Sequence, residues 1–428
     1  MRYHEGTDQG GGASRLLRPR VAVVGGGPAG LTAAMNLAAR LDGEVLVLER
    51  EREAGGIPRH SDHLGYGIRD LGRFTSGPRY AATLRDRALE AGAILRTGAT
   101  VTDWAGPRAV NVTTPEGRLR VEADCVVLAT GARERPRSAR LIPGDRGRGV
   151  YTTGHLQNVV HLHGGRVGSR AVVVGGELVS WSAVMTLKHA GCRTVLMTSE
   201  YPRPESYLAF RIGGRAMFRT PVAAHTRVTR ILGRGQVSGV EVQDLRTGGR
   251  RVVECDTVVL TGDWIPDNEL ARSAGIVLDP HTKGPEVDMA LRTSVPGVFA
   301  VGNALHPVDT ADVAALDGAA VADQVVRYLE GAATRSAGLR IRPADPIRWI
   351  SPQLFAVDGT NPPRDRLLAW VDRFVRLPVV TVRQDGEVRA RRRLPWPASP
   401  GRVFRIPASM LDDVRRGGGE VTIGIENT

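Results

Sequence analysis

The chain has 428 residues, which is too long for one compact core, so we expect two or three domains. Its 42% hydrophobic residues and 52 glycines are typical of an α/β protein, in which short turns repeatedly join strands to helices. The net charge of +13 comes almost wholly from arginine, and no basic run is interleaved with aromatic residues, so a biased genome composition explains it better than a nucleic-acid partner. No apolar run reaches the roughly 18 residues of a membrane helix, and we expect no membrane span.

The N-terminal segment and the cysteines indicate in which cellular compartment we expect the protein. Residues 1–18 lack the apolar core of a secretory signal, and we expect them to form a disordered leader. Cys125, Cys192 and Cys255 are far apart and lie beside apolar segments. This pattern favours small buried residues in a reducing cytosol over disulfides.

The first predicted unit has the order of a dinucleotide-binding motif. It begins with a strand at residues 21–24 and the glycine turn Gly25-x-Gly27-x-x-Gly30. A helix at residues 31–41 and a second strand at residues 44–48 follow, and the acidic residue Glu49 stands at the end of that strand. Gly25 allows the tight turn, Gly27 lets a pyrophosphate approach bare backbone, and Gly30 lets the helix pack close to the strand. The helix N-terminus supplies unpaired N–H groups to phosphate, and Glu49 accepts the hydroxyls of an adenosine ribose.

A second unit repeats this order with an altered turn. It begins with a strand at residues 170–174 and the turn Gly175-Gly-Glu177-Leu-Val-Ser180. A helix at residues 181–190 and a strand at residues 194–198 follow. In each half of the chain a later apolar strand ends in Thr-Gly, at residues 126–131 and 258–262. The chain therefore carries a pair of nucleotide-type domains and is not a solenoid.

The elements after the second unit complete the predicted architecture. They are a strand that ends in Gly302-Asn303, a helix at 311–329, a linker at 331–345 and strand candidates at 379–390, 402–406 and 420–425. We predict an α/β fold with two Rossmann-like three-layer domains, the second inserted in the first, and a small C-terminal β-rich domain. The predicted boundaries are 19–150 and 263–330 for the first domain, 151–262 for the second and 346–428 for the third.

Over residues 19–330 this pattern resembles the flavoproteins with two dinucleotide-binding domains, the pyridine nucleotide-disulfide oxidoreductase superfamily. The resemblance implies that the first domain binds FAD, that the second is of the NAD(P)H-binding type, and that the late Gly302-Asn303 returns to the FAD. Related sequences often have Asp where this chain has Asn303. The resemblance assigns to FAD the residues Gly25, Gly27, Pro28, Ala29, Gly30, Glu49, Arg50, Gly56, Val101, Ala129, Thr130, Gly131, Gly302 and Asn303.

Residues 55–69 and 261–266 are similar to components of amine- and amino-acid-oxidising flavoenzymes, such as opine oxidase, dye-linked proline dehydrogenase and hydrogen cyanide synthase. Related sequences often have Cys where this chain has Ser61, so a thiol role is absent there. No cysteine follows Cys255, which excludes an iron–sulfur cluster bound by the C-terminal residues. We expect no metal site.

Two features limit the chemistry. The chain has no Cys-x-x-Cys motif, and thiol–disulfide exchange needs an attacking and a resolving thiol, so we exclude disulfide reduction. Glu177 replaces the glycine that lets a pyrophosphate approach backbone, and it adds bulk and negative charge there. We expect that the second domain has lost the ability to bind NAD(P)H and serves as a scaffold or subunit interface. The alternative is that Glu177 turns outward and NAD(P)H binding survives.

If a substrate reduces the FAD, a base is needed near the flavin, because C–H oxidation is easier when the adjoining amine or alcohol is neutral. His60, His63 and Arg69 belong to the segment expected beside the flavin ring, and His306 follows the late strand. We predict these four as catalytic residues, with Arg69 or Arg59 holding a substrate carboxylate. The alternative is that the histidines cap loops or face solvent.

We therefore predict a cytoplasmic FAD-dependent dehydrogenase or oxidase that acts on an amine, amino acid or hydroxy acid by hydride transfer to flavin. The expected partners are a small-molecule substrate and a second flavoprotein or ferredoxin-like subunit, with the chain in an oligomer. One alternative is an NAD(P)H-dependent flavoprotein reductase that passes electrons to an external acceptor. Another is a non-catalytic nucleotide-binding subunit.

Overall fold

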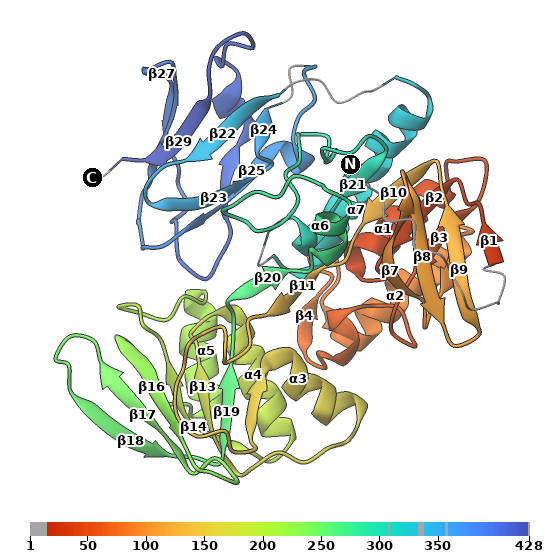
Figure 1. Ribbon diagram of the computed structural model, residues 1–428. Coiled ribbons are helices and arrows are strands. Elements are labelled where there is room, and N and C mark those ends of the chain that lie inside the picture. Colours follow the sequence, from red (N-terminus) through yellow and green to blue (C-terminus); the bar gives the residue numbers. More distant parts are fainter. Residues whose placement is uncertain (1–14, 307–308, 333–337, 356–357, 427–428) are drawn as a thin grey trace.

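The computed structural model describes residues 15–306, 309–332, 338–355 and 358–426. The chain folds into two Rossmann-type α/β domains and a β-rich C-terminal domain (Figure 1). The C-terminal domain contacts both of the others, since Trp349 stacks on His306 of the first and Phe374 packs against Tyr201 of the second.

The first domain is built on a five-stranded parallel sheet with β2 at its centre. The strand order is β21 (Val298–Ala300), β10 (Cys125–Leu128), β2 (Val21–Val24), β3 (Val45–Leu48) and β6 (Ile94–Arg96). Helices α1 (Pro28–Ala38), α2 (Gly77–Glu90) and α7 (Ala311–Leu329) pack with this sheet, and α1 contacts the other two. The inner strands are apolar and fully buried, as covered parallel sheets require.

A second sheet of the first domain completes its core. The strands are β7 (Thr100–Gly106), β8 (Ala109–Thr114), β9 (Gly117–Glu122) and β1 (Arg15–Leu17). The expectation of a disordered leader over residues 1–18 is wrong for residues 15–17, because β1 pairs in parallel with β9. Residues 1–14 of that leader lie outside the described residues.

The second domain repeats the parallel sheet of the first. The order is β12 (Val150–Thr152), β19 (Thr257–Leu260), β13 (Arg170–Val174), β14 (Arg193–Thr198) and β15 (Val222–Ala223). Its other elements are α3 (Thr153–Gln157), α4 (Leu178–His189), α5 (Leu208–Phe218), and the antiparallel β16 (Thr226–Leu232), β17 (Gly239–Asp244) and β18 (Arg250–Glu254). The chain enters and leaves this domain through paired strands β11 (Ala132–Glu134) and β20 (Trp264–Pro266).

The C-terminal domain is a pair of β-sheets around one apolar core. One sheet contains β24 (Leu354–Phe355), β22 (Leu339–Pro343), β29 (Val421–Ile425), β26 (Val379–Gln384) and β27 (Glu387–Arg393), and the other contains β23 (Ile347–Ser351), β25 (Arg366–Val371) and β28 (Phe404–Pro407). The linker expected over residues 331–345 is wrong in part, because β22 lies within it and pairs with β29. Short elements elsewhere are β4 (Leu64–Tyr66), β5 (Thr75–Ser76) and α6 (Glu269–Ser273).

Helix α7 lies so close to α1 that only glycine fits at their crossing. A Cβ atom on Gly318 would stand 2.1 Å from the carbonyl oxygen of Ala29. A Cβ on Gly30 would stand 1.9 Å from the carbonyl oxygen of Gly25, so α1 is equally close to the turn that precedes it. These two approaches fix the position of the first glycine turn.

Replacing Gly318 with alanine is expected to lower the free energy of unfolding by about 1–3 kcal/mol, because α7 must move away from α1. Urea or thermal denaturation measures the change. The matched control is Gly213→Ala in α5, where no heavy atom lies within 4 Å of the added Cβ, and its stability should be unchanged or slightly higher. Equal stability of Gly318→Ala and the unaltered protein would contradict the packing described here.

Candidate functional site

A cavity of about 730 Å³ lies where the three domains meet. The first domain contributes the glycine turn, the end of β3 and most of the segment 56–69 to its wall, and the second contributes parts of α3 and α4. The C-terminal domain contributes residues 401–403 and Arg405. The site is therefore composite, and each domain faces the same space.

The first glycine turn presents bare backbone to this cavity. Gly25 has a φ of +105°, and a Cβ there would stand 2.4 Å from the carbonyl oxygen of Ala129, so only glycine is accommodated. Gly27 lines the cavity, and nothing lies closer than 3.9 Å to a Cβ placed on it. Gly27 is also the N-cap of α1, and no side chain caps the helix there. The N–H groups at this helix N-terminus thus remain available to an anionic ligand, which fits a dinucleotide pyrophosphate.

Glu49 stands at the end of β3 and lines the same cavity. One carboxylate oxygen accepts the backbone N–H of Gly26 at 2.8 Å, and the other accepts that of Glu51 at 2.8 Å. These bonds fix the carboxylate in place. An ionised carboxylate has about four acceptor positions, so it retains capacity for ribose hydroxyls.

The other predicted cofactor residues divide into two groups. Those that line the cavity, besides Gly25, Gly27 and Glu49, are Pro28, Ala29, Arg50, Gly56, Val101, Ala129, Thr130, Gly131 and Asn303. Gly30 and Gly302 lie behind the wall and serve packing, since a Cβ on Gly302 would stand 2.9 Å from the Ala29 side chain. The Asn303 side chain exchanges two hydrogen bonds with the backbone of Asp309, which shapes the loop before α7.

His63 is the centre of a polar cluster that joins the first two domains. Its Nε2 lies 2.6 Å from the Ser182 hydroxyl and 3.0 Å from the Ser61 hydroxyl. The Gln157 amide donates to the same two hydroxyls, at 2.7 Å to Ser182 and 3.1 Å to Ser61. The Nδ1 of His63 lies 2.9 Å from the Leu64 carbonyl oxygen, an acceptor, so Nδ1 carries the proton and Nε2 is the basic nitrogen.

Burial keeps both cavity histidines neutral. It lowers the pKa of His63 below its usual 6.5, and with the nearby Arg59 it lowers the pKa of His60 to about 4. Sequence reasoning found these histidines but missed Gln157 and Ser182. Nothing local marks either residue, because Ser182 is 119 positions away from His63 in the chain.

Two predicted catalytic residues have other partners. Arg69 lines the cavity, but its guanidinium is bonded to the Asp312 carboxylate at 3.0 Å and 3.1 Å, so its charge is already neutralised. His306 does not line the cavity, which does not favour the catalytic role predicted for it. Its buried ring stacks on Trp349 with centroids 5.3 Å apart, and burial lowers its pKa to about 3.

The turn of the second domain is closed by its own side chains. Glu177 is the N-cap of α4, and its carboxylate accepts the backbone N–H of Ser180 in a capping box. The Ser180 hydroxyl in return accepts the N–H of Glu177 at 3.1 Å. Two N–H groups of this turn, those of Glu177 and Ser180, are therefore already hydrogen-bonded within it.

The C-terminal domain packs against this turn. A Cβ on Gly401 would stand 2.4 Å from the Cβ of Glu205 and 3.0 Å from the Cγ of Glu177, so the backbone of Gly401 lies directly on both acidic side chains. Burial, together with the neighbouring Glu205 carboxylate, raises the pKa of Glu177 to about 8, and burial raises that of Glu205 to about 7. With a pKa of about 8, Glu177 is largely neutral at pH 7, so its obstacle to a dinucleotide is the space that its side chain and Gly401 occupy.

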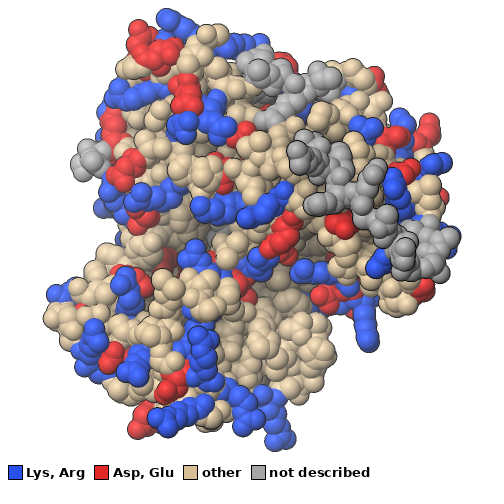
Figure 2. All heavy atoms as spheres, viewed as in Figure 1, with Lys and Arg blue, Asp and Glu red and all other residues tan. Residues whose placement is uncertain are grey.

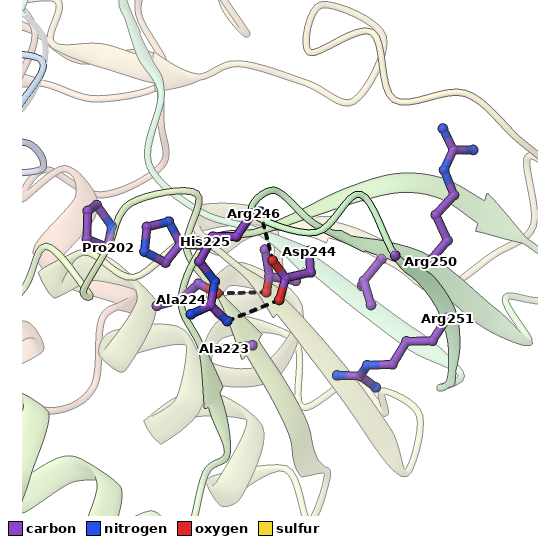
Figure 3. Close-up of a pocket in the computed structure, with 11 residues that line it drawn as sticks. Pro202, Ala223, Ala224, His225, Asp244, Arg246, Arg250 and Arg251 are labelled. Atoms are coloured by element: carbon purple, nitrogen blue, oxygen red, sulfur yellow. Dashed lines mark hydrogen bonds and ion pairs between the residues drawn. The ribbon is translucent and has the colours of Figure 1, made fainter.

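A second hollow of about 590 Å³ lies away from this site, at the edge of the second domain (Figure 3). Arg246 is paired with Asp244 in it, at 3.2 Å, and Arg250 bonds to Glu241 on the neighbouring strand, at 3.3 Å. It contains none of the predicted site residues. Within the described parts of the chain, no helix is both long and apolar enough to cross a membrane.

Comparison with known proteins agrees with this geometry. The model of the pyridine nucleotide-disulphide oxidoreductase family matches residues 19–318. Among curated relatives, thioredoxin reductase of Treponema pallidum (strain Nichols) is 27% identical over 72% of this chain and 97% of its own. One of the subunits of opine oxidase from Agrobacterium tumefaciens (strain Ach5) is 27% identical over 81% of this chain and 73% of its own.

A solved structure, that of thioredoxin reductase from T. acidophilum, superposes with a TM-score of 0.61 at 25% identity and covers 74% of this chain and 99% of its own. The family match spans well over half of the chain and includes both Rossmann-type domains. The chain belongs to the pyridine nucleotide-disulphide oxidoreductase family, a family of FAD-binding oxidoreductases.

Proposed function

We propose that this chain is an FAD-dependent dehydrogenase or oxidase of an amine, amino acid or hydroxy acid, and that the substrate itself, not NAD(P)H, reduces the cofactor. The observation that carries the proposal is the contrast between the two dinucleotide turns. The first is uncapped and lined by bare Gly27, whereas the second is capped by Glu177 and covered by Gly401. Only one of them is built to receive a dinucleotide.

The residues around the first turn would hold FAD. The α1 N-terminus and Gly27 would bind the pyrophosphate, and Glu49 would accept the ribose hydroxyls. Asn303 and the loop before α7 would face the ribityl portion, as the family resemblance implies. Bound FAD supplies an acceptor for the two electrons released when a substrate C–H bond is oxidised.

His63 would act as the base in this reaction. Its Nε2 is the unprotonated nitrogen, and the Ser182 hydroxyl bonded to it lines the cavity. A substrate amine or alcohol would give its proton to the Ser182 oxygen while the Ser182 proton moves to Nε2 of His63. The Gln157 amide, which donates to Ser182, would hold that hydroxyl in place.

We propose that the chain is not a disulfide reductase, although thioredoxin reductases are among its relatives. Cys125, Cys192 and Cys255 are all buried and unpaired. Burial raises the pKa of Cys125 and Cys192 to about 12 and that of Cys255 to about 11, so none forms the thiolate that attacks disulfides. None of the three lines the cavity.

A further protein would receive the electrons from the reduced cofactor. The opine oxidase relative is, by its name, one part of an assembly. We propose that the acceptor is a second flavoprotein or ferredoxin-like subunit, within an oligomer in the cytoplasm.

Replacing Gly27 with alanine is expected to weaken FAD binding about tenfold or more while leaving the fold intact. The added methyl makes only an ordinary contact with the protein, at 3.9 Å from the Cα of Gly56, and it enters the space next to the α1 N-terminus. Flavin retained after gel filtration, and thermal melting of the FAD-free protein, separate the two effects. Gly30→Ala is the contrasting variant, because its Cβ would meet the Gly25 carbonyl and should reduce stability. Unchanged FAD affinity in Gly27→Ala would contradict the assignment.

Replacing His63 with alanine is expected to slow reduction of the cofactor by substrate about 100-fold to 10,000-fold, with FAD still bound. In the unaltered protein the rate should be full at pH 7 and should fall only below pH 6.5, because burial lowers the His63 pKa and the neutral form is the base. Stopped-flow absorbance of the flavin band measures both. His155→Ala, on the exposed part of α3, is the control. Equal rates in His63→Ala and the control would remove His63 from the mechanism.

Anaerobic titration with NADH and with NADPH is expected to leave the flavin band unchanged, because the second turn is closed. A panel of amino acids, amines and hydroxy acids should contain a compound that bleaches it. Rapid bleaching by either nicotinamide nucleotide would instead establish the alternative function, an NAD(P)H-dependent flavoprotein reductase.

A further inference from the structure

Helix α4 presents three apolar side chains to the cavity, those of Leu178, Val179 and Met185, which we call the apolar strip. The other residues of this helix from Ser180 to Leu187 are buried, and several of them form the core of the second domain. The residues of the strip are only partly buried, and they belong to none of the hydrophobic clusters that the described residues form. The strip therefore faces the cavity and not the core.

The strip surrounds the hydroxyl that takes part in the proposed reaction. Leu178 and Val179 precede Ser182 by four and three positions, and Met185 follows it by three. Residues with these spacings are neighbours on the surface of a helix, with Cβ atoms about 5–6 Å apart. The Ser182 hydroxyl lies 2.6 Å from Nε2 of His63. A substrate whose amine or alcohol contacts this hydroxyl therefore lies between apolar side chains along α4.

This wall of the cavity offers no charge to a substrate. Of the second-domain residues that the structure describes, no Arg, Lys or His lines the cavity. Glu177 lines it, but burial raises the pKa of its carboxyl to about 8, so it is largely neutral at pH 7. Val403 of the C-terminal domain adds a further apolar side chain to the lining, close in sequence to Gly401, which packs against Glu177.

The charged side chains gather elsewhere. Figure 2 shows Lys and Arg at the outer surface, along the edge of the C-terminal domain that faces the second domain. A charged or strongly polar substituent that points at the α4 wall would lose its water without finding an oppositely charged partner on that wall, which is unfavourable. An apolar substituent would instead gain by leaving water.

We propose that Leu178, Val179 and Met185 bind an apolar substituent of the substrate, so that the enzyme prefers an amine, amino acid or hydroxy acid with an aliphatic or aromatic group over small or polar ones. This inference rests on the proposed function and refines its substrate class. Roughly four carbon atoms span the distance from the reacting group to the neighbouring side chains of α4. Each methylene that the substrate buries there should strengthen binding about fourfold.

Analogues that cannot react test the proposal without requiring turnover, because a carbon that carries no hydrogen has no hydride to give. The apolar probes are tert-pentylamine and α-methylleucine, and their polar counterparts of similar shape are aminomethylpropanol and α-methylasparagine. The α-hydroxy acids with the carbon skeletons of these two amino acids complete the set. Calorimetry and the change in flavin absorbance measure binding to the oxidised holoprotein. At least one apolar probe should bind saturably, and its polar counterpart should bind about tenfold or more weakly.

Replacing residues of the strip should remove this preference. Leu178→Ala and Met185→Ala should each weaken binding of the apolar probe about fivefold or more, and Leu178→Asn should bind the two counterparts about equally. The matched control is Met217→Ala, since Met217 is exposed on α5 of the same domain and does not line the cavity. It should bind every probe normally. FAD affinity and thermal melting of all four variants should match those of the unaltered protein.

The outcomes separate this proposal from its rivals. Equal binding of apolar and polar counterparts by the unaltered protein, or failure of every apolar probe to bind, would overturn it. Loss of FAD from Leu178→Ala and Met185→Ala would assign the strip to the cofactor and would overturn it as well. If apolar probes bind but no amine, amino acid or hydroxy acid bleaches the flavin, the role of the strip holds and the proposed function fails.

Discussion

The structure depends on the close approach of α1 to its surroundings at Ala29 and Gly30. Gly30 lies against the carbonyl oxygen of Gly25, and Gly318 of α7 lies against the carbonyl oxygen of Ala29. Gly302 lies against the side chain of Ala29. Because none of these approaches leaves room for a Cβ, the N-terminus of α1 is held rigidly at the wall of the cavity. That rigidity keeps the helix N–H groups together as a ready anion site without help from a capping side chain.

The second domain has the same topology, but the N-terminus of its helix α4 has different hydrogen-bond partners from that of α1. Glu177 and Ser180 bond to each other across the turn before α4, and Gly401 of the C-terminal domain packs against Glu177. The second domain carries Gln157 and Ser182 to the cavity, and we propose that it serves as a support and no longer binds NAD(P)H. The chemistry that we propose follows from this division, with one domain holding the cofactor and the other two completing the substrate space.

The sequence predicts well those parts of the fold that depend on residues close together in the chain. The glycine turn, Glu49 and the bounds of α7 follow from residue spacing, and the carboxylate at position 177 already pointed to an altered turn. The site could not be read in the same way. The His63–Ser182 bond, the Arg69–Asp312 pair and the burial of His306 under Trp349 each join residues that come together only after the domains have packed. The sequence predicts residues 402–406 only as a strand, because the contact of Gly401 with Glu177 and Glu205 forms only after the domains have packed.

Equilibrium dialysis of the FAD-loaded protein against labelled NADH and NADPH tests the central claim most directly. That claim is that the chain keeps one open dinucleotide turn and has closed the other. The account predicts one tightly bound FAD per chain and no retained NADH or NADPH, both in the unaltered protein and in Glu177→Gly, where Gly401 still covers the turn. Retention of one nicotinamide nucleotide per chain by the unaltered protein would contradict it.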